Sequence, residues 1–392
     1  MAMPGGAVAE PGSSATAIGP KGYYYWPVNR VRALDTRVSG ALAAGATTRV
    51  RVTGLSGVPA TGVVSVSVNL TVLTPAVTGS LTAFADGTSW SGATMSFQAG
   101  QTNQNFETVP VTGRGMIDIR NNTTRPLTLI VDILGYSQSS QLEAWNQYQS
   151  MTPTRLLDTR TGQPLAAGQT RTIQLSGRAG IPLPQDYDDV AVVVNLTVLA
   201  PSRSGSLTVG TKNTPSISFA AGRTEQSQLL KVLDRSGGLS IRNNSAAPIQ
   251  VIADVVGYHS RINFVDAGFF EYFNMFDEPY RIYDSRARGN ASVLPGHTVV
   301  LDTYPFVNGN AQAGFCAGLL NVTVLAPSTA GSVSVSPYGA SDVTPNISFA
   351  AHQTRQRQLM MQGGVLNNFQ IRNNSSAPIT LIADVDGWRT CA

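Results

Sequence analysis

The chain has 392 residues, a formal net charge of +4 and only 13% charged residues. This length allows two or three domains that each bury a core, and the charged fraction lies well below the roughly 25% that is usual in soluble domains. Lys and Arg do not cluster in the sequence, which argues against the basic stripe of a nucleic-acid groove. No run reaches the ~20 apolar residues that span a bilayer, so we expect no membrane insertion.

The N-terminal segment, residues 1–31, is predicted to be an arm. Residues 1–20 are mostly small, and Glu10 carries their only charged side chain. They lack the basic and apolar regions of a secretory signal peptide. We therefore expect a protein made for use in the cytoplasm, a protein freed by lysis, or a fragment of a longer precursor.

Five sequence markers occur three times in the same order. The first copy reads Arg-Ala-Leu-Asp-Thr-Arg, Asn-Leu-Thr-Val-Leu, Ser-Phe-Gln-Ala, Ile-Arg-Asn-Asn and Asp-Ile-Leu-Gly-Tyr, and close variants follow in the second and third copies. The period is far longer than that of a solenoid repeat, so each copy is predicted to be a complete domain with its own core. The markers begin at residues 32, 69, 96, 119 and 132, at 155, 195, 218, 241 and 254, and at 281, 321, 348, 371 and 384.

Apolar and polar residues alternate within each repeat. In residues 64–72, Val or Leu occupies every even position and Ser, Asn or Thr every odd one, which predicts a strand with one wet face. Short strands separated by turn residues predict an all-β protein of three tandem antiparallel β-sandwich domains, of Greek-key or jelly-roll type. In the second repeat we expect strands at residues 155–158, 170–175, 190–199, 206–209, 216–219, 228–233, 239–242 and 249–256.

These strands and markers divide the chain into three repeats with two linkers, of which the second is rich in aromatic residues. The predicted segments are the N-terminal arm 1–31, repeat 1 at 32–137, a linker at 138–154, repeat 2 at 155–259, an aromatic linker at 260–280, and repeat 3 at 281–392.

As a set, the markers resemble those of a β-domain repeated in secreted, cell-wall-associated proteins of actinobacteria. They also resemble domains in minor tail proteins of the phages that infect these bacteria. The resemblance covers residues 32–388 and implies an accessory, non-catalytic module without a defined ligand site. The missing signal peptide and catalytic domain favour a virion protein, and the third repeat departs from the pattern with His352 in place of Gly100 and Gly222.

The Asp residues of the first and last markers invite comparison with paired catalytic carboxylates. Asp132, however, alternates in phase with Ile130 and Leu134, so it lies on an apolar face and needs a partner there. The nearby Arg residues supply one, which favours structural Arg–Asp clamps that tie the first strand to the last over catalysis. The predicted clamp residues are Arg32, Asp35, Arg37 and Asp132, then Arg155, Asp158, Arg160 and Asp254, then Arg281, Asp284, Arg286 and Asp384.

No residue set predicts a metal, a cofactor or a catalytic site. His259, His297 and His352 do not recur at equivalent positions, so surface histidines are the expectation. The isolated Asp384-Val-Asp386 pair is a weak calcium motif.

Two cysteines, Cys316 and Cys391, belong to the third repeat. Cys316 takes the place of Val64 and Val190 on the apolar face of its strand, and Cys391 is expected after the final strand. A disulfide that pins the C-terminus and a pair of unlinked thiols are both open, and the disulfide would be expected only outside the cytosol.

Aromatic residues gather ahead of the repeats, where a flexible spacer would not use them. We expect those of the second linker to dock one repeat on the next, with a platform for sugars or a partner protein as the alternative, and those of the N-terminal segment to contact another subunit. The candidate interface residues are Tyr23, Tyr24, Tyr25, Trp26, Trp145, Phe269, Phe270, Tyr272, Phe273 and Phe276.

The sequence therefore predicts a structural and adhesive bacteriophage virion protein without enzymatic activity, located in the tail, a fibre or the capsid exterior. Its expected partners are other virion proteins or copies of itself in a ring or trimer, with host cell-wall polysaccharide as a further target. The first alternative is a secreted actinobacterial cell-wall or polysaccharide-binding module, acting outside the cell. The second alternative is a glycan hydrolase.

Overall fold

Almost all the regular structure is β-strand, which confirms the predicted all-β class. No helix within the described ranges is long and apolar enough to cross a membrane. The computed structural model describes residues 23–89, 93–139, 147–184, 190–210, 215–260, 273–287, 291–303, 314–340 and 345–391.

Within the described residues, each repeat contributes eight strands in the same order. The first repeat contains β1 (Tyr23–Asp35), α1 (Thr36–Ser39), β2 (Thr47–Arg51), β3 (Val63–Leu73), β4 (Gly79–Ala85), β5 (Met95–Phe97), β6 (Asn103–Pro110), β7 (Met116–Asn121) and β8 (Thr128–Ser139). The second contains β9 (Gln147–Asp158), η1 (Thr159–Thr161), β10 (Thr170–Gln174), β11 (Ala191–Leu199), β12 (Gly205–Val209), β13 (Ile217–Phe219), β14 (Glu225–Val232), β15 (Gly238–Asn243) and β16 (Gln250–Ser260). The third contains β17 (Phe273–Asp284), β18 (Thr298–Leu301), β19 (Gly314–Leu325), β20 (Gly331–Pro337), β21 (Ile347–Phe349), β22 (Arg355–Gln362), η2 (Val365–Asn367), β23 (Phe369–Asn373) and β24 (Thr380–Cys391).

The strands of a repeat form two four-stranded antiparallel sheets. In every repeat the first strand pairs with the last, so the chain ends of the repeat lie side by side. One hydrophobic cluster of buried residues lies within each repeat and draws on both of its sheets, because alternate side chains of each strand point inward. The strand orders are β1-β8-β3-β6 with β2-β7-β4-β5, β9-β16-β11-β14 with β10-β15-β12-β13, and β17-β24-β19-β22 with β18-β23-β20-β21.

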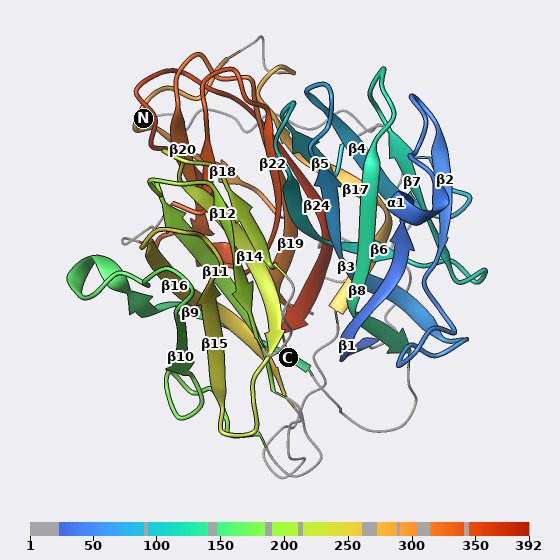
Figure 1. Ribbon diagram of the computed structural model, residues 1–392, viewed down its shortest axis with the longest axis horizontal. Helices are drawn as coiled ribbons and strands as arrows, with labels where there is room; N and C mark the ends of the chain where they lie inside the picture. The colour runs from blue at the N-terminus through green and yellow to red at the C-terminus, as the bar shows by residue number, and fades with distance from the viewer. Residues whose placement is uncertain are drawn as a thin grey trace.

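The repeats are not three separate sandwich domains in tandem, and this part of the prediction is corrected. The edge strands β6, β14 and β22 contact one another, and each also contacts a short strand of the next repeat: β6 meets β13, β14 meets β21, and β22 meets β5. The six sheets therefore surround a common centre in a propeller-like arrangement, with the first repeat on the right of Figure 1 and the second on the left.

A fourth hydrophobic cluster lies where the repeats meet. It combines Tyr25 and Phe106 of the first repeat with residues of the second, such as Leu230, and of the third, such as Met360. A shared core of this kind joins the repeats into one body, whereas tandem domains would each keep their own core alone. We call this group the central cluster.

The polar face of strand β3 is dry, which corrects the predicted wet face. Ser65, Ser67, Asn69 and Thr71 are between 1% and 7% exposed. Alternation correctly predicts that the two faces differ, but the second face of this strand packs inside the ring and not against solvent. The hydroxyl oxygens of Ser67 and Thr108, for example, lie 3.1 Å apart across two paired strands.

All eight strands expected in the second repeat are observed, but the first begins earlier than predicted, at Gln147. Likewise β1 begins at Tyr23 and β17 at Phe273, so part of the predicted arm and linkers is strand paired with the end of its own repeat. Register shifts interrupt these first strands, for example between Pro27 and Val31. Such irregularities break the alternation by which a strand is recognised in a sequence.

Candidate functional site

The predicted Arg and Asp residues lie together at the start of each repeat. In the second repeat, Arg155 pairs in register with Asp254 of the last strand, and its guanidinium donates to both carboxylate oxygens at 2.8 and 3.2 Å. It also donates to Asp158 at 3.3 Å, and Arg160 donates to Asp158 from Nε and Nη2 at 2.9 and 2.5 Å. Four charged groups thus join the first strand of the repeat to its last.

The other two repeats contain the same arrangement. Arg32 donates to Asp132 at 2.5 Å and to Asp35 at 2.6 Å, and the guanidinium of Arg37 donates twice to Asp35. Arg281 bonds Asp384 and Asp284, and Arg286 bonds Asp284.

The first-marker carboxyls are held in their charged form. Hydrogen bonds from Arg160 lower the pKa of Asp158 to about 2, and the equivalent bonds lower the pKa of Asp35 and Asp284. In contrast, burial raises the pKa of Asp384. A general acid and base need a cleft that admits substrate and a proton that can move, whereas these carboxylates are occupied by guanidinium groups.

The small residues of the first and last markers also serve the fold. Thr159 accepts a hydrogen bond from the backbone amide of Val251 at 2.7 Å, and Thr36 and Ser285 accept equivalent bonds. A methyl group on Gly257 would overlap the ring of Tyr148, which lies against the glycine. The residues of these markers therefore hold the first and last strands of each repeat together.

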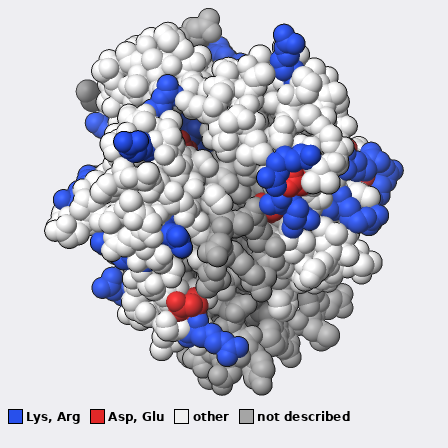
Figure 2. Space-filling view, viewed as in Figure 1, with Lys and Arg blue, Asp and Glu red and all other residues white. Residues whose placement is uncertain are grey.

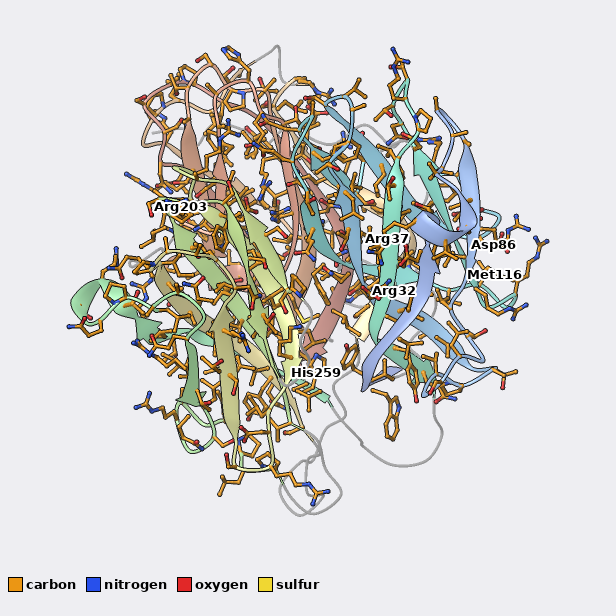
Figure 3. All side chains as sticks on the ribbon, viewed as in Figure 1. Arg32, Arg37, Asp86, Met116, Arg203 and His259 are labelled. Atoms are coloured by element: carbon orange, nitrogen blue, oxygen red, sulfur yellow. The ribbon has the colours of Figure 1, made fainter. Side chains whose placement is uncertain are left out.

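Tyr25 is placed differently from the prediction of contact with another subunit. It is 7% exposed in the central cluster, with its ring centroid 4.5 Å from that of His259 in the second repeat. Trp26 is half-buried against the core of its own repeat. His259 is 4% exposed, so its predicted surface position is wrong; Figure 3 shows it near the centre of the molecule. Here aromatic residues dock one repeat on another.

For some of the remaining aromatic candidates the structure describes only the backbone, and the others lie outside the described residues. Tyr23, Tyr24, Phe273 and Phe276 belong to strands β1 and β17. Trp145, Phe269, Phe270 and Tyr272 lie outside the described residues.

The two cysteines lie on neighbouring strands. Cys391 is the last residue of β24, where a position after the strand was expected, and it pairs with Gly314 of β19. Cys316 lies at a register shift of β19, between Phe315 and Ala317. Their side chains lie outside the described part of the structure, so the disulfide stays a prediction.

Equivalent glutamines close the ring between repeats. Gln104 donates to the carbonyl of Pro215, Gln226 to that of Pro345, and Gln356 to that of Ala93. The donors occupy the same position in β6, β14 and β22, and the acceptors precede β13, β21 and β5. The contacts run from repeat 1 to 2, from 2 to 3 and from 3 to 1, and we call them the 1–2, 2–3 and 3–1 seams.

A second set of glutamines binds backbone across two of the seams. At the 2–3 seam, Gln228 accepts from Met360 N at 2.7 Å and donates to Met360 O at 3.1 Å. At the 3–1 seam, Gln358 accepts from Thr108 N at 2.7 Å and donates to Thr108 O at 3.3 Å. These side chains satisfy edge-strand groups that would otherwise be buried without partners.

An ionic group joins all three repeats beside these glutamines. Glu225 of the second repeat accepts hydrogen bonds from Arg355 and Arg357 of the third, and both arginines are 2% exposed. Arg355 also donates to Asn103 at 3.3 Å and Arg357 to Asn105 at 3.2 Å, both in the first repeat. Burial lowers the pKa of Arg357 to about 10 and also lowers that of Arg355.

A cavity of about 1070 Å³ opens over the 1–2 and 2–3 seams, with Arg160, Arg223 and Glu225 among its lining residues. Many of its polar groups already have partners: Arg223 donates to Gln98 at 2.8 Å, and Ser218 donates to Gln104 at 3.2 Å. The cavity is therefore a space between repeats whose hydrogen-bonding groups are largely engaged within the protein.

The charged residues that the structure describes do not gather into a basic stripe or a metal site. Lys and Arg form small separate groups on the face in Figure 2, without a continuous stripe. Among the described residues, no group of three or more His, Cys, Asp or Glu is placed to hold a metal ion.

The residues at the seams were missed by sequence reasoning. One available signal was the recurrence of Gln104, Gln226 and Gln356 at one strand position. Another was the run Arg355-Gln-Arg357-Gln, which continues directly into apolar residues of the same strand.

Comparisons with known proteins assign neither a family nor a function. No protein-family model matches the sequence, and no curated protein matches it. Among solved structures, one of Sulfolobus turreted icosahedral virus has a TM-score of 0.19 at 12% identity, covering 97% of this chain and 99% of its own. A structure of the triple jelly roll fold and turret assembly in an archaeal virus has a TM-score of 0.18 at 12% identity, covering 97% and 98%. A chain of the lipid-containing bacteriophage PM2 has a TM-score of 0.11 at 10% identity, covering 90% and 98%. Scores of this size do not establish a shared fold.

Proposed function

We propose that this chain is a structural component of a phage virion, in which three fused repeats form one ring-shaped unit. The observation that carries the proposal is the cyclic closure of the seams by Gln104, Gln226 and Gln356. Contacts that run in one direction and close after three steps are those of a trimer. A single chain with this geometry suits a site where a trimeric building block is needed.

The marker resemblance to minor tail proteins of actinobacterial phages supports the choice of a virion. The clamps support a non-catalytic role, because the carboxylates that sequence comparison singles out serve as acceptors for Arg32, Arg155 and Arg281. Contacts with other virion proteins and with the host envelope belong to the same proposal. The unit would present the outer strands of its sheets, such as β2 at the edge opposite β5, and the loops around them.

Mass spectrometry and electron microscopy of purified particles test the virion role. We expect the chain in stoichiometric amounts in intact particles and a matching ring-shaped density on the tail or capsid exterior. A chain that stays in the lysate supernatant while particles assemble without it would refute the proposal.

The alternative of a secreted cell-wall or polysaccharide-binding module is favoured only by the cavity over the seams. Retention of the pure protein on isolated actinobacterial cell walls, lost when Arg223 is replaced by Ala, would support that module. Turnover of wall glycans by the pure protein, lost in a folded Asp158→Asn variant, would instead establish a hydrolase.

A further inference from the structure

Two buried carboxyl groups face each other across the 3–1 seam. Glu107 of the first repeat is 2% exposed and Asp386 of the third is 6% exposed. The amide nitrogen of Gln358 donates to Glu107 at 3.1 Å and to Asp386 at 2.7 Å. Both carboxyl groups therefore lie within hydrogen-bonding distance of one atom, in a region from which solvent is excluded.

The charges around this pair leave one negative charge in excess. Asp386 is near Asp384, which is paired with Arg281, and Glu107 is near Arg357. Beyond them, Arg355 and Arg357 face Glu225. Two arginines thus stand against three carboxyl groups, namely Glu107, Asp386 and Glu225, and one added proton makes the set neutral. Two buried carboxyl groups this close do not both ionise readily.

The hydrogen bonds favour a proton over a metal ion as the neutralising cation. Asn105 donates to Glu107 Oε2 at 3.1 Å, so three of the four carboxyl oxygens accept N–H groups. Asp386 Oδ1 lacks a hydrogen-bond partner among the described atoms. A calcium ion needs six to eight oxygen ligands, whereas a proton needs one oxygen. The adjoining cavity of about 30 Å³, lined by both carboxyl groups, has room for a water molecule.

We propose that one proton, shared by Glu107 and Asp386, holds the 3–1 seam closed, so that protonation controls the opening of the ring. The chain itself connects repeat 1 to 2 and repeat 2 to 3, whereas the contact of repeat 3 with repeat 1 has no covalent link. The 3–1 seam is therefore the one at which the ring opens without separating neighbours in the chain. Opening would expose the central cluster to a partner or to solvent.

The pH dependence has a definite sign. Burial raises the pKa of Asp386 to about 8 and that of Glu107 well above its ordinary value. The closed seam therefore keeps a proton that the open form releases near pH 4. Closure is tightest below about pH 4 and weakens as pH rises to about 8, with the opening equilibrium growing up to tenfold per pH unit.

Amide hydrogen exchange on the full chain tests this directly. The amide of Thr108 reports the 3–1 seam through its bond to Gln358, and the equivalent amide of Met360 reports the 2–3 seam through Gln228. After correction for intrinsic rates, we expect opening at Thr108 to rise up to tenfold per unit from pH 5 to 8, and opening at Met360 to stay nearly constant.

Asp386→Leu, which copies Leu134 of the first repeat, and the near-isosteric Glu107→Gln should each weaken this pH dependence, because each removes one of the two buried carboxyl groups that keep the proton in the closed seam. Glu107→Gln keeps the test decisive if Asp386→Leu does not fold. Parallel pH profiles at Thr108 and Met360, or an unchanged profile in a folded variant, would overturn the proposal.

Discussion

The ring depends on side chains that bind the backbone of a neighbouring repeat, and Gln228→Leu tests this dependence. Gln228 is 3% exposed, makes two hydrogen bonds to Met360 across the 2–3 seam, and donates a third to Asn195 of its own repeat at 3.0 Å. Leucine has a similar volume and no hydrogen-bonding group. The substitution therefore removes the bonds with little change in packing.

The expected cost follows from the groups left behind. The amide and carbonyl of Met360 would both be buried without a partner, and each such group costs about 1–3 kcal/mol. The side-chain oxygen of Asn195 also loses its donor, but Asn195 is only half-buried, so water can replace that bond at little cost. The apolar side chain returns about 1 kcal/mol through burial. We expect the free energy of unfolding to fall by about 2–4 kcal/mol.

Urea unfolding of the full chain measures this cost, with hydrogen exchange at Met360 as the local readout. Gln174→Leu is the matched control, because Gln174 donates to the carbonyl of Ser236 at 2.7 Å but is exposed and lies within one repeat. We expect the control to lose less than about 1 kcal/mol. Equal losses in both variants, or unchanged exchange at Met360, would refute the assigned role of the seam glutamines.

Three other predictions concern the repeats themselves. Gly257→Ala should lower the free energy of unfolding by about 1–3 kcal/mol, because its methyl group overlaps a tyrosine ring, whereas Gly162→Ala, with open space around it, should be nearly neutral in the same urea titration. Asp158→Asn should reduce the loss of unfolding free energy between about pH 4 and pH 2. The low pKa of Asp158 stabilises the fold above pH 4, and this contribution disappears as pH falls through about 2. Identical pH profiles of stability in the variant and the unmodified protein would contradict this prediction. His352→Gly should raise thermal stability by about 0.5–1 kcal/mol, because His352 has a φ of 59°, which glycine adopts without strain, and a lower melting temperature would show that the imidazole makes a compensating contact.

Much of each repeat can be predicted from the sequence, because the markers are local and recur. The Arg and Asp of the first marker are three residues apart, and strand alternation places Asp132 where a charged partner is required. The buried asparagines of the Ile-Arg-Asn-Asn marker are a similar case. Asn243 donates to the carbonyls of Leu165, Ala166 and Ala247, which explains why the marker repeats this residue.

Much of the ring could not be predicted in the same way, because several of its contacts join residues that differ between repeats. One position in the edge strand is Phe106 in the first repeat, Gln228 in the second and Gln358 in the third. Comparison of the copies treats such a position as variable and therefore unimportant. In the structure all three side chains face the seams, with Phe106 in the central cluster where the glutamines bind backbone.

A ring made from one chain can carry different residues at equivalent positions of its three repeats. If three identical repeats met at this centre, each charged position would occur three times, and three copies of Arg355 and Arg357 or of Glu225 would repel one another in a medium that screens charge poorly. In the observed ring, a carboxylate from the second repeat lies between two arginines of the third, and neutral Asn103 and Asn105 of the first complete their hydrogen bonds.

This arrangement predicts an asymmetric response to mutation. Glu225→Gln should cost about 3–5 kcal/mol of unfolding free energy, because it removes the carboxylate that the two buried guanidinium groups share. Replacing Glu225, Arg355 and Arg357 together by Leu should cost much less, since apolar side chains often substitute for a buried ionic group at little loss. If urea unfolding gave the triple variant the larger loss, the ionic group would be a net source of stability and not a device that fixes the order of the repeats.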